Sequence, residues 1–178
     1  VTVNLGVVAI AANGLARYDG DDKIRKDVAE QTARITHTTS GAYRFHTALF
    51  NDNTEPDSSR QTKQGTTEAY YSDGQLERIA DKYHDKLGKT SIVMLVVDCA
   101  GIENGEIGGE AIYKGEGSYP WIRIPAVNKF ASGVYAHEIG HLLSPRGLGE
   151  GLGHKRVMNC HLEDASGRPT QLYAVDTI

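Results

Sequence analysis

Apolar residues follow two alternating patterns along the chain: continuous or every-second-residue runs, and stripes that recur every three to four positions. The apolar, β-branched runs at 1–11 (VTVNLGVVAIA) and 91–98 (SIVMLVVD) predict two strands, the second of them buried on both faces. Alternation of apolar and polar residues at 42–51 (AYRFHTALFN) predicts a third strand. Two short strands are expected at about 110–114 and 121–124, in and just after a glycine-rich segment.

Helical periodicity appears between these strands. The first predicted helix spans about 21–37, and its approximate apolar stripe comprises Ile24, Val28, Ala33 and Ile35. The second is capped by Ser72 or Asp73 and ends at Gly88. Its apolar face comprises Leu76, Ile79, Ala80, Tyr83 and Leu87.

A third helix is predicted from an Asn128 cap to Leu143, because Pro145 disfavours the helical conformation just before it. The order β-α-β-α-β-(β)-α favours an α/β (α+β) fold, a mixed sheet with helices packed on it. The polar segment at 51–65 is expected to be a surface loop and not a linker between domains. We therefore expect the whole chain to form a single domain.

Composition and charge exclude two classes of partner. Hydrophobic residues make up 39% and charged residues 24% of the 178 residues, which is ordinary for a globular protein. The formal net charge of −4 provides no attraction to nucleic acid. The longest apolar run, at 92–97, is too short to span a bilayer. We expect a monomer that binds neither nucleic acid nor a membrane.

The start of the chain and its cysteines bear on where the protein resides. Val1 is preceded by no charged or apolar leader, so we expect that a signal or pro-segment has been removed or that the sequence starts within a longer one. Cys99 and Cys160 fit a single disulfide in an exported protein, or two buried free thiols.

The motif HEIGH at 137–141 carries the strongest chemical signal. His137 and His141 are four residues apart, so on a helix they project from the same face and can bind one Zn²⁺. Glu138 would take a proton from an attacking water and pass it to a leaving amine. A separate small-to-apolar stripe of the same helix is expected to pack on the sheet; it comprises Ser132, Ala136, Ile139 and Leu143.

The motif resembles that of the metzincin zinc endopeptidases, HExxHxxGxxH followed by a methionine-containing turn. The family's glycine and third-ligand positions hold Ser144 and Gly147 here. With 144–150 (SPRGLGE) treated as an insertion, the remainder reads HEIGH-LL-GLGH, which implies His154 as the third metal ligand. Met158 in VMN then supplies the methionine turn.

The resemblance also implies a fold and a substrate. Metzincins have a twisted, mostly parallel sheet with an antiparallel edge strand, an active-site helix and a small lower subdomain. The helix before the buried strand is most similar to the adamalysin branch. The expected subdomains are 1–143 and 144–178, and a disulfide between Cys99 and Cys160 is expected to brace the site. A peptide substrate would add to the edge strand as an extended segment. In this interpretation Tyr173 would stabilise the oxyanion.

Other third ligands remain open. Glu150 is the nearest carboxylate after His141, and Glu163 lies 22 residues downstream of it, a distance similar to that of the glutamate ligand in thermolysin-like peptidases. His161 and Asp164 are residual candidates. No calcium-binding loop is recognisable, so no structural Ca²⁺ site is assigned.

These observations predict a secreted, zinc-dependent endopeptidase with one catalytic Zn²⁺. The alternatives are a thermolysin-like metallopeptidase that uses Glu163, and a non-catalytic binding module whose site the insertion has destroyed.

Overall fold

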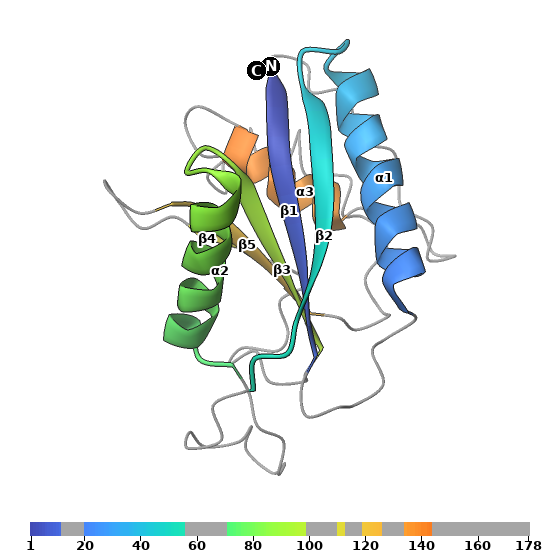
Figure 1. The fold of residues 1–178 in the computed structure, drawn as a ribbon. Coiled ribbons are helices and arrows are strands. Elements are labelled where there is room, and N and C mark those ends of the chain that lie inside the picture. Colours follow the sequence, from blue (N-terminus) through green and yellow to red (C-terminus); the bar gives the residue numbers. More distant parts are fainter. Residues whose placement is uncertain (12–19, 56–70, 99–109, 113–118, 126–133, 144–178) are drawn as a thin grey trace.

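A computed structural model describes residues 1–11, 20–55, 71–98, 110–112, 119–125 and 134–143. In chain order its elements are β1 (Thr2–Ala11), α1 (Gly20–Thr38), β2 (Arg44–Asp52), α2 (Asp73–Leu87), β3 (Ile92–Asp98), β4 (Glu110–Ile112), β5 (Trp121–Pro125) and α3 (Val134–Leu143). The prediction of a mixed sheet covered by helices is confirmed. Figure 1 shows this sheet with α2 in front of it and α1 along its β2 side.

The strands of the described part form one sheet of five, in the order β2-β1-β3-β5-β4. The pairs β1–β2, β1–β3 and β3–β5 are parallel. The short strand β4 lies at the opposite edge from β2 and runs antiparallel to β5, with Ala111 opposite Ile122. The sheet is therefore mostly parallel, and its one antiparallel strand is an edge.

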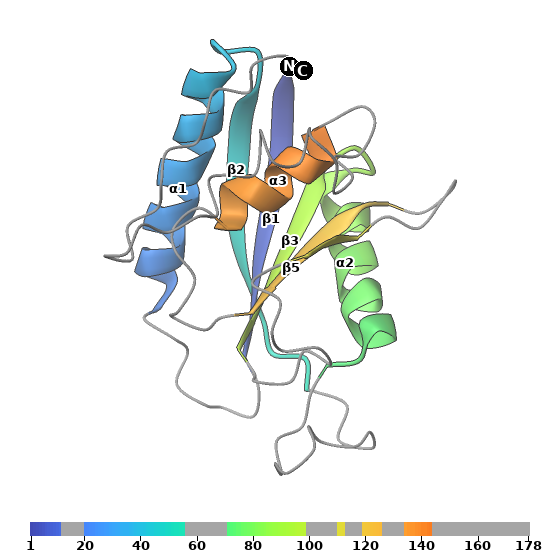
Figure 2. The same cartoon turned by 180° about the vertical axis from the view of Figure 1, so that it is seen from behind.

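Helices α1 and α3 cover the same face of the sheet (Figure 2). Their buried apolar side chains join those of the central strands in one cluster. It contains Val3, Leu5, Val7, Ala9, Ile24, Val28, Ile35, Ile92, Met94, Val96, Ile122, Ile124, Ala136 and Ile139. Ala136 and Ile139, which were predicted to face the sheet, are thus buried in the core.

Helix α2 covers the other face, as Figure 1 shows. Its predicted cap is confirmed, because the Ser72 hydroxyl accepts a hydrogen bond from the N–H of Gln75. Gly6 in β1 lets the helix approach closely, since a Cβ there would lie 2.2 Å from Leu87 Cδ1. The second core cluster comprises Val8, Ile10, Tyr71, Leu76, Ile79, Ala80, Tyr83, Val93, Leu95, Val97 and Trp121.

The predicted stripe of α1 was wrong at one position. Ala33 is exposed, whereas Gln31 and Thr32 are buried. Successive helical residues are about 100° apart, so Gln31 and Thr32 flank the direction of Val28 while Ala33 turns away from it. The face of α1 that packs on the sheet is therefore partly polar.

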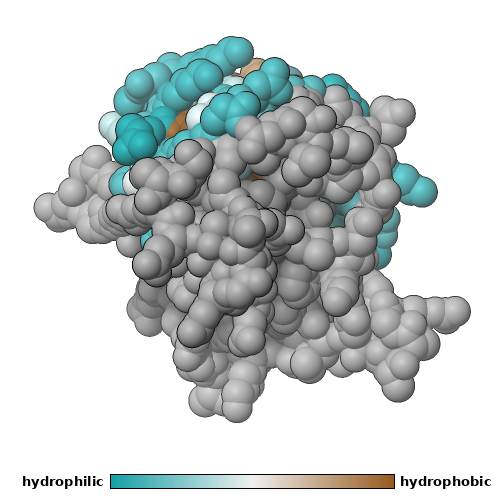
Figure 3. All heavy atoms as spheres, turned by 90° about the horizontal axis from the view of Figure 1, so that it is seen from below, coloured by the Kyte–Doolittle hydropathy of each residue, from teal (hydrophilic) through white to brown (hydrophobic). Residues whose placement is uncertain are grey.

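The surface of the described part is largely polar. Figure 3 shows mainly hydrophilic side chains among the coloured atoms. Among the described residues, Val1 is the only exposed large hydrophobic side chain. None of the described helices is both long enough and apolar enough to cross a membrane.

Candidate metal centre

Helix α3 separates its candidate metal-ligating side chains from its core side chains. At about 100° per residue, His137 and His141 lie roughly 40° apart around the helix axis, with Glu138 beyond His141 on the same side. Ala136 and Ile139 face the opposite way, into the core under the sheet. Packing of the apolar side therefore fixes the direction of the two histidines.

The three side chains form a compact cluster. The candidate ligand atoms of His137, Glu138 and His141 all lie within 4.8 Å of one another. The two imidazole rings meet edge to face, with centroids 5.1 Å apart. His137 Nε2 lies 3.8 Å from Glu138 Oε1. His137 is 8% exposed and Glu138 4%, so the polar groups are held inside the protein.

The donor set fits zinc. Two imidazole nitrogens are ligands that Zn²⁺ prefers, and His137 and His141 would hold the ion. A catalytic zinc site commonly takes three protein ligands. The described residues provide His137 and His141, with the carboxyl of Glu138 beside them.

Glu138 is a buried carboxyl next to the edge strand. The pKa of Glu138 is raised to about 7, and burial is the largest cause. The charge of Glu110 also raises this pKa, whereas a hydrogen bond from the Ala111 backbone N–H lowers it. A carboxyl with a pKa near neutrality can both accept and release a proton at physiological pH. The Ala111 N–H ties this carboxyl to β4.

A charged cluster fastens β4 to its neighbours. Arg123 of β5 donates to Glu110 of β4 through Nε at 3.0 Å and through Nη2, and to Asp73 of α2 through Nη1. The Arg123 side chain is 8% exposed, while Glu110 and Asp73 are 41% and 58% exposed. Solvent weakens the contribution of such pairs to stability. The Arg123–Glu110 pair joins residues that lie opposite each other in β5 and β4.

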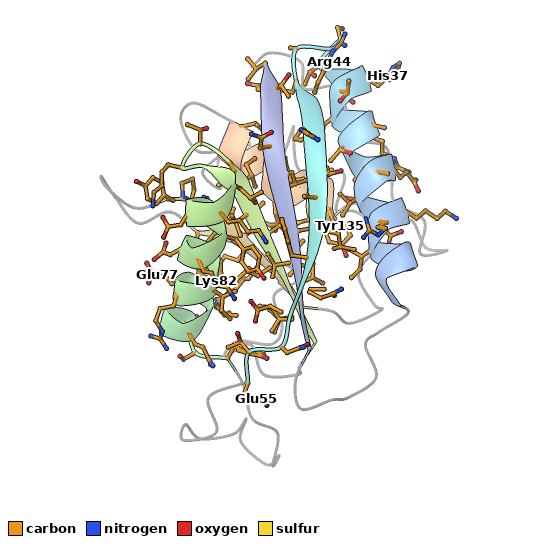
Figure 4. All side chains as sticks on the ribbon, viewed as in Figure 1. His37, Arg44, Glu55, Glu77, Lys82 and Tyr135 are labelled. Carbon is orange, nitrogen blue, oxygen red and sulfur yellow. The ribbon has the colours of Figure 1, made fainter. Side chains whose placement is uncertain are left out.

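A residue of α1 and a residue just before β2 contact the described part of α3 near its two ends. The Oε1 atom of Gln31 in α1 accepts a hydrogen bond from the Ala136 N–H at 2.8 Å. Just before β2, the Tyr43 hydroxyl donates to the Leu143 carbonyl at 3.4 Å. Tyr135 extends towards α1 (Figure 4), and burial together with the nearby charge of Asp27 raises the pKa of Tyr135 to about 12.

Most of the remaining predicted site residues lie outside the described residues. These are the third-ligand candidate His154, the alternatives Glu150, His161, Glu163 and Asp164, the methionine-turn residue Met158, the cysteines Cys99 and Cys160, and Tyr173. The part of the predicted third helix before Val134 and the predicted lower subdomain 144–178 also lie outside them. All of these stay predictions.

The structure adds site residues that sequence reasoning missed. Gln31, Tyr43 and the Ala111 N–H each contact α3 from a different part of the chain. The motif gives no signal for them, because two of the contacts involve backbone atoms of α3 and the third a backbone atom of β4. Glu110 and Arg123 lie in two segments that were each predicted as a short strand. The pairing of these two strands, and the contact between the two side chains, were not predicted.

No protein-family model matches the chain, and a search of curated proteins finds no significant match. The case for a function therefore depends on the residues and geometry described above.

Proposed function

We propose that the protein is a zinc-dependent endopeptidase in which His137 and His141 bind the metal and Glu138 transfers protons. One observation carries the proposal: two imidazoles and a buried carboxyl, spaced as HExxH on one helix, lie within 4.8 Å of one another beside an edge strand. Two histidines and a glutamate on a solvent-exposed helix would be ordinary surface residues. Burial of His137 and Glu138 argues against that interpretation.

Each residue has a separate chemical task. Bound zinc would lower the pKa of a water and polarise the scissile carbonyl. Glu138 accepts the proton that the attacking water loses and passes it to the nitrogen of the leaving amine. The Ala111 N–H and the walls of the core keep the carboxyl in place for both transfers. The peptide bond is cleaved, and one water is consumed.

The proposed substrate is a protein segment in extended form. β4 is an edge strand, and an edge offers unpaired backbone groups to which another strand can bind. Because Ala111 of this strand also contacts Glu138, a peptide aligned along β4 would pass close to the proton-transfer group. We propose that the enzyme is secreted and acts as a monomer, with His154 as the third ligand.

Replacement of Glu138 by glutamine tests this function. The amide keeps the size of the side chain but cannot take up the proton, so Glu138→Gln should retain zinc and lose about 10²–10⁴-fold in the rate of protein hydrolysis. The measurement is cleavage of a generic protein substrate, with metal content determined on the same samples.

The control is wild-type protein treated with a chelator and then resupplied with zinc. Chelation should abolish cleavage, and zinc should restore it. Normal cleavage by Glu138→Gln would contradict the assigned mechanism. A wild-type protein that binds zinc but cleaves nothing would instead indicate a non-catalytic binding module.

A further inference from the structure

Gln31 is a buried polar side chain that lies far in sequence from the metal motif but contacts it directly. It is 0% exposed and sits in the middle of α1. Its Oε1 atom accepts the N–H of Ala136, 105 residues along the chain and next to His137. Figure 2 shows α1 and α3 together on the same face of the sheet.

The contact joins the backbone of α3 to α1 close to the metal motif. Ala136 is the third of the ten described residues of α3 and immediately precedes His137. Only the oxygen of a glutamine amide can accept an N–H, so this bond also fixes which way the amide of Gln31 points. Gln31 thus fastens the backbone of α3 to another helix.

Packing alone does not account for a glutamine at this position. The Nε2 atom of Gln31 is buried and has no hydrogen-bond partner within the described part of the chain. A buried donor without a partner is unfavourable, and an apolar side chain of similar shape would avoid it. Thr32, the other buried polar residue beside it, bonds carbonyls of its own helix instead.

The described part of α3 contains a residue that weakens a helix. It has ten described residues, and Gly140 lies within it between the two histidines. Glycine in a helix interior weakens the helix, so tertiary contacts on both sides of Gly140 help to hold it. A shift of the backbone at Ala136 would move His137 relative to His141, and the Tyr43 contact with Leu143 secures the His141 side.

We propose that Gln31 is a positioning residue of the metal centre: by accepting the Ala136 N–H it fixes the backbone of α3 beside His137 and so pre-orients this histidine for the metal. The inference rests on the proposed zinc function. Gln31 acts through the backbone and touches neither the ion nor the substrate.

The test compares zinc affinity in four proteins: wild type, Gln31→Met, Gln31→Glu and Thr32→Val. Gln31→Met keeps the shape but removes the acceptor, and its zinc dissociation constant should rise about tenfold or more, as for other residues that orient a metal ligand. Gln31→Glu keeps an oxygen in the same place and should recover most of the affinity. Thr32→Val removes a buried hydrogen bond of α1 and should leave zinc affinity unchanged even if it lowers stability.

Amide hydrogen exchange at Ala136 provides a second measurement that does not depend on zinc. In wild type this amide should exchange slowly, and in Gln31→Met it should exchange at least tenfold faster than in Thr32→Val. Equal zinc affinity in wild type and Gln31→Met would overturn the inference, as would rapid exchange at Ala136 in wild type. Absence of zinc binding in wild type would overturn the proposed function, while the exchange rates would still decide whether Gln31 anchors the helix.

Discussion

His84 is a titratable side chain that the fold buries completely, on the α2 side of the sheet. It is 0% exposed, and its Nε2 atom contacts the Pro120 carbonyl at 3.1 Å, so this nitrogen carries the proton. Burial lowers the pKa of His84. The hydrogen bond to Pro120 and the charges of Asp81 and Asp85 raise it, and Lys89 lowers it, but burial prevails.

The pKa of His84 predicts how stability depends on pH. The unfolded chain protonates this histidine near pH 6.5, whereas the folded protein resists protonation. The contribution of His84 is therefore present above about pH 6.5 and is lost as the pH falls through the lower pKa of the folded state. Urea unfolding at pH 7.5 and pH 5.0 should show a smaller loss of unfolding free energy in His84→Gln than in wild type.

The comparison of the two proteins removes the effect of the other histidines, which titrate in both. An equal loss in wild type and His84→Gln would show that His84 does not resist protonation in the folded state.

Residue by residue, the sequence predicts apolar core positions better than polar ones. The apolar face of α2 was predicted correctly at Leu76, Ile79, Ala80 and Tyr83, because each is apolar and follows the helical period. Gln31 and His84 were missed, since polar residues are mostly exposed and their burial depends on partners. Those partners, the Ala136 N–H and the Pro120 carbonyl, are backbone groups that no side-chain pattern reveals.

Strand β4 is the element whose position most directly affects the proposed chemistry. Its described part has three residues, and backbone pairing over so short a stretch is weak. The Arg123–Glu110 pair therefore sets where the Ala111 N–H meets the Glu138 carboxyl. β4 was predicted to reach about residue 114, and its described part ends at Ile112.

Loss of the arginine should impair catalysis without removing the metal. Arg123→Met should lower kcat/KM for a protein substrate about tenfold, because the loss of a hydrogen bond to a charged group is worth about 1.5 kcal/mol or more. Zinc content should stay the same, since neither histidine contacts Arg123 in the described structure. Steady-state kinetics and metal analysis on the same preparation measure both quantities.

Asp73→Asn is the matched control. It weakens the contact between Arg123 and α2 but leaves the Arg123–Glu110 pair in place, so kcat/KM should change little. Equal effects of the two substitutions, or zinc loss in Arg123→Met, would contradict a role for Arg123 in fixing β4.

At the scale of the whole molecule, strand and helix order was predictable because each element carries its own periodicity. The central position of β3 followed from its continuous apolar sequence, and the structure buries every residue from Ile92 to Val97. The order β2-β1-β3-β5-β4 could not be read from periodicity, because it depends on which strands pair across the chain. For the proposed metal centre, the motif pointed to the two histidines and Glu138, but not to the contacts that α1 and β4 make with α3.

The zinc content of the purified protein tests the central proposal most directly. Elemental analysis of wild type and His141→Ala, prepared side by side, should find one zinc per chain in the wild type and little in the variant, because two histidines on one helix supply essential ligands. His154→Ala, analysed with them, should also lose zinc if His154 is the third ligand. Wild-type protein without zinc, or full zinc in His141→Ala, would contradict the proposed metal centre.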